Sequence, residues 1–329
     1  WNLDALAGKG EYLQTIANYT REIFVPNEWS NKRLFVKFYG VQSIADVFVN
    51  GHHAGEHRGG WTAFTFEITP FLKYGENNSL VVVVNNSYQN DILPTSSEIN
   101  LYGGIYRDVE LIVTERTTVS PLYYGSDGIL IHQNNITNTS VDATAAVYVT
   151  AVEDKSCDMT ITVQAPSGET VFSRFMKVRI EPNTPINIPF RIDEPLLWSP
   201  EEPNLYDFVL ELTNGSETDS VKGYFAMRKY SIGQHAGYAR LFLNNEPYFQ
   251  RGLLDQGYWS DGGLTPPTDE AMIYDIQVMK DLGFNMLRKH IKVEPARWYY
   301  YCDKYGMLVW QDMISGGKAL NLFHAGVLP

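Results

Sequence analysis

The sequence has 329 residues, 44% of them hydrophobic and 19% charged, and its 26 Lys and Arg against 38 Asp and Glu give a net charge of −12. This composition supplies a sizeable core and excludes global disorder. The acidic excess argues against a nucleic-acid binder, which needs clustered Lys and Arg. The longest apolar runs, such as residues 80–84, are far shorter than the roughly 18–20 residues that span a bilayer. We therefore expect neither a nucleic acid nor a membrane as partner.

The two cysteines, Cys157 and Cys302, lie far apart in the sequence. Neither a disulfide framework nor a metal site fits this pattern, because both need more ligands at short spacing. We expect two buried free thiols, no metal and no cofactor. The sequence starts at Trp1 without a signal segment, so it reads as a piece of a longer protein whose compartment stays unknown.

Residues 1–115 read as short strands about ten residues apart, separated by Gly, Asn and Pro. The turn pair Asn50-Gly51 follows one of these strands and predicts a hairpin, because both of its turn positions tolerate a positive φ. This spacing predicts a β-sandwich of jelly-roll type. The expected strands cover residues 33–40, 45–49, 63–68, 80–84 and 109–113.

Residues 116–231 also read as short strands separated by turns, at a more regular spacing. This pattern predicts an immunoglobulin-like β-sandwich of about seven strands. This part carries no functional signal of its own. The clearest expected strands cover residues 143–150, 159–165, 187–192, 207–212 and 221–225.

In residues 232–329 the spacing of the apolar residues changes from a pattern of strands alone to one of alternating helices and strands. Helical spacing over 269–282 and 295–305 alternates with short apolar strands at 284–288 and 307–310, which predicts parallel βαβ units. A (β/α)₈ barrel takes about 250 residues, so the chain stops after roughly three of eight barrel strands. Such an incomplete barrel leaves an open parallel sheet that exposes an edge and apolar faces, so we expect this third of a barrel to be poorly ordered or covered by a neighbouring chain.

This order of domains resembles glycoside hydrolase family 2, which includes β-galactosidases, β-glucuronidases and β-mannosidases. Eight local motifs follow in family order along nearly the whole chain. They are Phe48-Val49-Asn50-Gly51, Gly59-Gly60-Trp61-Thr62-Ala63-Phe64, Gly103-Gly104-Ile105-Tyr106-Arg107-Asp108-Val109, Leu197-Trp198-Ser199-Pro200 with Pro203-Asn204-Leu205-Tyr206, Phe225-Ala226-Met227-Arg228, Phe242-Leu243-Asn244-Asn245 with Pro247 and Arg251-Gly252, Met279-Lys280-Asp281-Leu282-Gly283-Phe284-Asn285 with Arg288, and Cys302-Asp303-Lys304-Tyr305-Gly306.

The resemblance implies a retaining β-glycosidase whose substrate is a carbohydrate. Retaining enzymes use two carboxyl groups about 5–5.5 Å apart, one as acid/base and one as nucleophile. In the family both glutamates follow later barrel strands, so here we expect them beyond residue 329 and expect the fragment itself to be inactive. The two Asn-Glu pairs of the chain, at Glu28 and Glu246, fit ordinary turns instead.

Residues that follow the expected barrel strands are the candidates for contacts with the sugar, because barrel sites lie at the carboxyl ends of the strands. The resemblance points to Asp255 and Trp259 after the first strand, although the family more usually shows Asn and His-Glu there. Arg288 and His290 follow the second strand, with His290 one residue off the family position. The third strand supplies Asp312, and the first domain contributes Glu98 on a loop.

The competing hypothesis is a non-catalytic carbohydrate-binding protein that uses the jelly-roll domain. An aromatic content of 13% fits this hypothesis as well, because flat rings stack on sugar faces. The sequence leaves open which sugar is bound, the compartment, and whether the protein forms a homo-oligomer.

Overall fold

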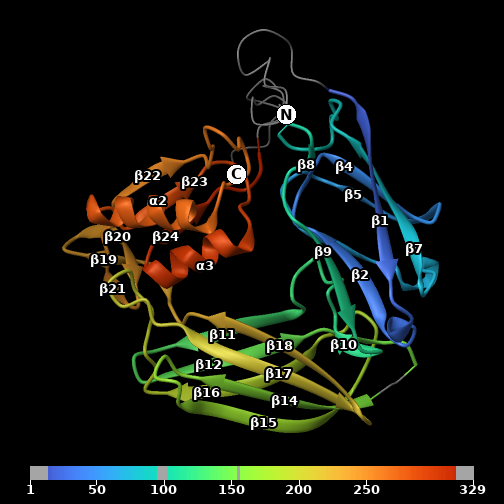
Figure 1. The fold of residues 1–329 in the computed structure, drawn as a ribbon. Helices are drawn as coiled ribbons and strands as arrows, with labels where there is room; N and C mark the ends of the chain where they lie inside the picture. Colours follow the sequence, from blue (N-terminus) through green and yellow to red (C-terminus); the bar gives the residue numbers. More distant parts are fainter. Residues whose placement is uncertain (1–13, 95–101, 154–155, 316–329) are drawn as a thin grey trace.

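The computed structural model describes residues 14–94, 102–153 and 156–315, which form two β-sandwiches and a parallel sheet with two helices. Figure 1 shows the first sandwich, in blue to cyan, beside the parallel sheet, in orange to red, with the second sandwich next to both. The fold is therefore the predicted one: a jelly-roll sandwich, an immunoglobulin-like sandwich and the first strands and helices of a (β/α) barrel.

The first sandwich packs a four-stranded sheet, β1-β7-β4-β5, on a three-stranded sheet, β6-β2-β9. The alternation of apolar and polar residues directs side chains such as Val36, Phe38, Val47 and Val82 into a common core. The elements are β1 (Ile16–Val25), η1 (Asn27–Trp29), β2 (Arg33–Phe38), β3 (Val41–Gln42), β4 (Ile44–Val49), β5 (His52–Arg58), β6 (Phe64–Glu67), η2 (Thr69–Phe71), β7 (Glu76–Asn85), β8 (Gly104–Ile105) and β9 (Val109–Thr114).

The predicted hairpin at Asn50-Gly51 is confirmed, since these residues connect β4 to β5 with φ values of 50° and 82°. Strand β1 was not predicted. Arg21 and Glu22 interrupt its apolar positions, and seven of its ten residues are exposed in an unbroken run, so its sequence lacks the alternation of a half-buried strand.

The second sandwich packs the sheet β11-β12-β16 on the sheet β15-β14-β17-β18, with β10 and β13 as a separate pair. The seven main strands match the predicted number, and Cys157 is buried in their core and forms no disulfide, as expected. The strands are β10 (Thr117–Val119), β11 (Ile129–Ile136), β12 (Ser140–Val147), β13 (Val149–Ala151), β14 (Ser156–Gln164), β15 (Thr170–Arg179), β16 (Ile186–Asp193), β17 (Tyr206–Asn214) and β18 (Glu217–Phe225).

The third part begins with an antiparallel sheet, β19-β20-β21, and continues as the parallel sheet β22-β23-β24. The predicted helices form at the predicted places: Thr268 caps the first by accepting a hydrogen bond from the Ala271 N–H, and Gly306 ends the second at a φ of 73°. The elements are β19 (Tyr230–His235), β20 (Tyr238–Leu243), β21 (Glu246–Pro247), β22 (Gly252–Asp255), α2 (Asp269–Asp281), β23 (Met286–Lys289), α3 (Ala296–Tyr305) and β24 (Leu308–Gln311).

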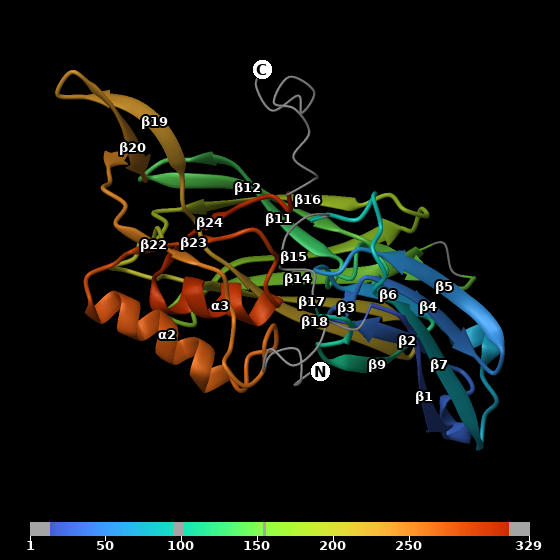
Figure 2. The ribbon, with the colours of Figure 1, turned by 90° about the horizontal axis from the view of Figure 1, so that it is seen from above.

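Helices α2 and α3 cover one face of the parallel sheet around Met272, Leu287 and Cys302, the second buried thiol. The other face is covered only at the start of its strands, where Met286 and Leu308 pack against Trp198 and Ala226. On the opposite face Leu254, Arg288 and Trp310 lie side by side in the strand register, and all three are exposed. Figure 2 shows that the hairpin of β19 and β20 also projects away from the other sheets. This face is therefore open near the strand ends, and its cover by a neighbouring chain stays a prediction.

The described part of the chain contains no helix with the length and apolar character needed to cross a bilayer.

Arg107, from the motif at the end of the first domain, joins the first sandwich to the parallel sheet. Its Nη2 donates a hydrogen bond of 2.6 Å to the Val293 carbonyl oxygen, and its Nη1 donates one of 3.0 Å to the carbonyl oxygen of Trp61. Trp61 and Tyr106 are buried beside Leu264 in the same seam. The first sandwich is thus fixed next to the loops that follow the parallel strands.

Asp303 of α3 joins the second sandwich to the parallel sheet in the same way. Its carboxylate pairs with Arg228 at 2.5 Å and accepts a hydrogen bond from the Tyr224 hydroxyl at 3.2 Å. Its carbonyl oxygen accepts a hydrogen bond from the Trp198 indole at 2.7 Å, and the Arg228 guanidinium lies over that indole ring. Residues from three of the sequence motifs therefore meet at one interface.

Candidate functional site

The carboxyl ends of β22, β23 and β24 form one edge of the parallel sheet and bring together residues that are far apart in sequence. Asp255 pairs in register with Lys289, Lys289 pairs with Gln311, and Asp312 comes directly after β24. The main chain also links the three ends, because the His290 N–H donates to the Asp255 carbonyl and the Asp312 N–H donates to that of Lys289. This edge is where a barrel fold places its site.

Arg288 and Asp312 form a two-pronged ion pair on the open face of the sheet. The Nε and Nη2 groups of Arg288 donate to the two carboxylate oxygens of Asp312 at 3.0 and 2.9 Å. This geometry holds both side chains in one plane and raises the pKa of Arg288. The pair presents a fixed, planar polar surface next to the exposed Trp310.

Asp255 uses both carboxylate oxygens within the protein. One oxygen accepts a hydrogen bond of 2.7 Å from the Gly257 N–H, as in a loop cap, and the other lies 2.8 Å from the Lys289 ammonium. The structure therefore gives Asp255 the role of holding the loop after β22. Its side chain is about a quarter exposed.

Below this loop lies a buried cluster of charges on the helix side of the sheet. The ammonium groups of Lys289 and Lys292 lie 3.2 and 3.1 Å from one carboxylate oxygen of Glu294, and the Arg107 guanidinium lies 4.0 Å from the other. Lys292 also donates a hydrogen bond of 2.7 Å to the Gly257 carbonyl oxygen. The cluster connects the loops after two strands to the first sandwich.

Burial and pairing shift the pKa values in the cluster in predictable directions. Burial lowers the pKa of Lys292 to about 8, because a charged ammonium loses its water there. For Glu294, burial raises the pKa, but the neighbouring cations Lys289, Lys292 and Arg107 outweigh this effect and lower it overall. Glu294 thus remains an anion and serves as the counter-charge of its neighbours.

The sequence analysis did not single out Lys289, Lys292 or Glu294. One usable signal was present: in a strand, Lys289 must face the side opposite to Arg288, which is the side of the helices. A lysine on that side has to find a buried carboxylate, and Glu294 is the acidic residue nearest in sequence.

His290 and Gln256 meet above the sheet edge, where the Gln256 amide nitrogen lies 3.1 Å from the His290 Nδ1. His290 is partly exposed there. Trp259 lies deeper than expected of a ring that stacks on a sugar, since it is partly buried against the core of α2 and α3. Glu98 lies outside the described residues.

Glu28 and Glu246, the two glutamates that follow an asparagine, lie in local turns as predicted. Glu28 is an exposed residue of η1, and Glu246 is exposed just after a turn in which Asn244 and Asn245 have φ values of 52° and 69°. Neither glutamate lies at the edge of the parallel sheet.

The edge carries several side chains that can form hydrogen bonds. Arg288, Asp312, His290 and Gln256 offer donors and acceptors in fixed positions. Within residues 14–94, 102–153 and 156–315, no three His, Cys, Asp or Glu side chains are grouped so that they could hold a metal ion.

Two sequence models of one family match the chain. The sugar-binding domain of glycosyl hydrolases family 2 matches residues 11–115, and a second family 2 domain matches residues 129–228. Together they cover well over half of the chain and coincide with the two sandwiches. The chain belongs to glycoside hydrolase family 2. The resemblance found in the motifs is thereby confirmed.

Relatives from this family match nearly the whole chain. A β-glucuronidase of Bacteroides fragilis is 35% identical over 95% of the chain, which spans 45% of the length of that relative. A β-galactosidase of Thermoanaerobacter pseudethanolicus is 28% identical over 93% of the chain, which spans 40% of that relative. The chain thus spans less than half the length of these curated relatives.

Solved structures of the family share the fold. The structure of Bacteroides uniformis β-glucuronidase 2, covalently bound to cyclophellitol-6-carboxylate aziridine, aligns with a TM-score of 0.83 at 28% identity. The alignment covers 92% of this chain and 37% of that one. The third part of the chain, which the two family models do not cover, is included to a large extent in this alignment.

Proposed function

We propose that the protein to which these residues belong hydrolyses β-linked glycosides with retention of configuration, through a glycosyl-enzyme intermediate. The observation that carries the proposal is the edge of the parallel sheet. Two family 2 sandwiches precede it, and the ends of three barrel-type strands bring Arg288, His290 and Asp312 together there. The family's two catalytic glutamates would come from later barrel strands.

The 329 residues by themselves do not catalyse this reaction. Hydrolysis with retention needs two carboxyl groups about 5–5.5 Å apart, with one able to give up its proton and the other free to attack. The carboxylates of Asp255, Glu294 and Asp312 are each paired with a lysine or arginine. We expect no release of aryl alcohol from aryl β-glycosides by this chain.

Residues 1–115, 116–231 and 232–329 act as separate domains in this proposal, and the third supplies part of the wall of the sugar site. Glu98, Asp255, Trp259, Arg288, His290 and Asp312 are the proposed substrate-binding residues. Arg288 with Asp312 and His290 with Gln256 have the exposure to meet sugar hydroxyls directly. Asp255 supports the loop that carries Gln256.

A chimera tests the proposal. In the chimera, this chain replaces the part of the B. fragilis β-glucuronidase that matches it, an alignment that covers 95% of the chain. The remainder of the chimera is the sequence of that relative. We expect the folded chimera to hydrolyse an aryl β-glycoside. His290→Ala should lower kcat/KM by about 10- to 100-fold, because it removes a hydrogen bond to a sugar hydroxyl.

The matched control is His235→Ala, which removes an exposed histidine from the end of β19 and should leave kcat/KM unchanged. A chimera that folds but shows no glycosidase turnover would overturn the proposed function. Turnover by the 329-residue chain alone that is lost in Glu28→Gln or Glu246→Gln would show that the catalytic residues lie elsewhere.

A further inference from the structure

Gln256 and His290 face each other at the edge of the parallel sheet, each directly after the end of its strand, β22 or β23. The Gln256 amide nitrogen Nε2 lies 3.1 Å from the His290 Nδ1. Gln256 is exposed and His290 is partly exposed. Because exposed side chains are otherwise free to change rotamer, this contact depends on how firmly the main chain holds both residues.

The main chain around Gln256 is held on both sides. Before it, the Asp255 carboxylate accepts a hydrogen bond of 2.7 Å from the Gly257 N–H. After it, the Gly257 carbonyl oxygen accepts one of 2.7 Å from the buried ammonium of Lys292. The His290 N–H in turn donates to the Asp255 carbonyl oxygen at 2.9 Å. Gln256 thus lies between two anchored neighbours, and one of them also holds His290.

The contact decides which ring nitrogen of His290 carries the proton. A neutral imidazole has one N–H group, and its other nitrogen can only accept. The amide nitrogen of Gln256 donates and does not accept, so its position 3.1 Å from Nδ1 makes Nδ1 the acceptor. The proton of the neutral ring then lies on Nε2, the nitrogen that Gln256 does not contact.

We propose that Gln256 is a positioning residue that holds His290 in the Nε2–H tautomer, so that His290 donates a hydrogen bond to a hydroxyl oxygen of the sugar. This inference rests on the proposed function. A hydrogen bond from the opposite ring nitrogen is the usual means of fixing the tautomer of a histidine. The substrate must offer an accepting oxygen at this point. A deoxy sugar that lacks it leaves the donor unpaired and is a poor substrate.

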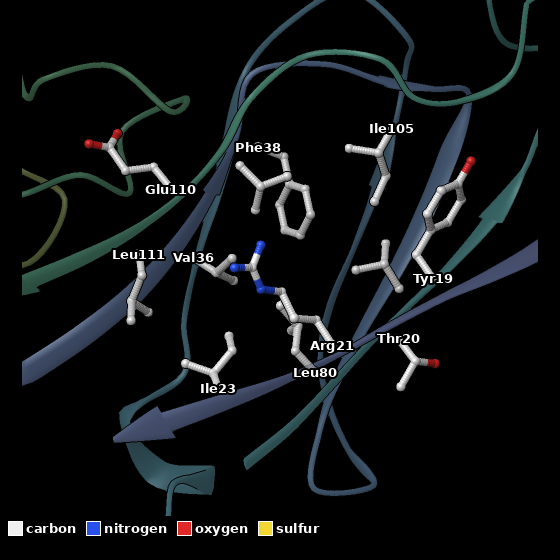
Figure 3. A pocket seen from close by; sticks show the side chains of 12 residues that line it. Tyr19, Thr20, Arg21, Ile23, Val36, Phe38, Leu80, Ile105, Glu110 and Leu111 are labelled. Atoms are coloured by element: carbon white, nitrogen blue, oxygen red, sulfur yellow. The ribbon is translucent and has the colours of Figure 1, made fainter. Parts of the chain in front are cut away.

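The pocket between the two sheets of the first sandwich offers a different kind of surface. Figure 3 shows Ile23, Val36, Leu80 and Leu111 among the side chains that line it. Aliphatic groups form no hydrogen bonds, whereas sugar hydroxyls need partners when they leave water. Recognition of a hydroxyl group therefore fits the polar edge of the parallel sheet better than this pocket.

NMR of the 329-residue chain tests the tautomer without any assay of activity. With ¹⁵N-labelled histidine, long-range ¹H–¹⁵N correlations distinguish protonated from unprotonated ring nitrogens, and the spectrum of His290→Asn assigns the signals of His290 among the seven histidines. At about pH 9, where imidazole is neutral, we expect the proton of His290 on Nε2. Gln256→Glu should move it to Nδ1, because a carboxylate only accepts.

Kinetics of the chimera test the role of the contact in the reaction. Gln256→Met removes the amide with little change in side-chain volume and should lower kcat/KM by about two- to tenfold, the range of one neutral hydrogen bond. In the His290→Ala background the same change should have no further effect, because Gln256 acts through His290. Gln277→Met, at an exposed glutamine of α2, is the matched control and should leave kcat/KM unchanged.

Three outcomes would overturn the inference and leave the proposed function intact. His290 could carry its proton on Nδ1 in the wild type, with the amide oxygen of Gln256 turned to the ring. Gln256→Met could leave kcat/KM unchanged. It could also lower kcat/KM equally with and without His290, which would make Gln256 a direct sugar ligand. A folded chimera without turnover would instead overturn the proposed function and the inference together.

Discussion

Lys292 combines full burial with a charge, which is costly for any residue in a protein interior. Its side chain is 0% exposed, yet it carries an ammonium group next to Glu294 and the Gly257 carbonyl oxygen. The carboxylate and the carbonyl replace the water that the ammonium has lost. This replacement is incomplete, because burial still lowers the pKa of Lys292 to about 8.

The lowered pKa of Lys292 predicts a stability that rises with pH. The pKa is 10.5 in the unfolded chain and about 8 in the folded one, so the unfolded chain binds more protons between these values. The free energy of unfolding should therefore rise by about 1.5 kcal/mol from pH 8 to pH 9.5 through Lys292 alone.

Urea unfolding of the wild type and of Lys292→Met at several pH values isolates this contribution, because the tyrosines and Cys302 titrate equally in both proteins. The wild-type value minus the variant value should increase over that range. A difference that stays constant or falls would contradict the assignment of the shift to Lys292.

At the level of elements, the loop between β22 and α2 depends on its contact with the buried cluster. Gly257 lies in this loop with a φ of 59°, and a Cβ atom there would meet the Glu294 carboxylate at 2.3 Å and both lysine ammonium groups at 3.0 Å. The loop can approach the cluster this closely only because residue 257 has no side chain.

Gly257→Ala should therefore lower the free energy of unfolding by about 3 kcal/mol, from the left-handed backbone and the collision together. Gly215→Ala is a close control, because Gly215 has the same φ of 59° in the turn between β17 and β18 with nothing within 4 Å of its Cβ position. It should cost only about 1 kcal/mol. Equal losses in urea unfolding would mean that the cluster does not hold the loop.

At the level of the whole molecule, the motif residues serve mainly to join the three parts. Arg107 reaches from the first sandwich to Val293, and Trp198 and Arg228 reach from the second sandwich to Asp303 on α3. These contacts hold the parallel sheet against both sandwiches although its other face is open near the strand ends. The position of the candidate site relative to the sandwiches depends on them.

Asp303→Asn should weaken the attachment of α3, because it leaves the largely buried Arg228 without its counter-charge. We expect a loss of about 3 kcal/mol in the free energy of unfolding and faster hydrogen exchange in residues 296–305, with residues 140–147 unaffected. Asp281→Asn at the exposed end of α2 is the control and should change neither quantity. Faster exchange in both segments alike would argue for global destabilisation instead.

The sequence by itself determined the fold class, the order of the three parts, the Asn50-Gly51 hairpin and both helices. These features follow from local signals, because side-chain period, turn residues and helix caps act over a few residues. The pairing of Arg288 with Asp312 could also be predicted in part from the sequence, since strand ends meet at one edge of a parallel sheet.

Only the tertiary structure decided the rest. The cluster of Lys289, Lys292 and Glu294 and the loop-holding role of Asp255 both depend on which segments approach one another. Ion pairing and burial depend on distances of a few ångströms between segments that are far apart in sequence. A sequence pattern with a period of two or 3.6 residues carries no information about these distances.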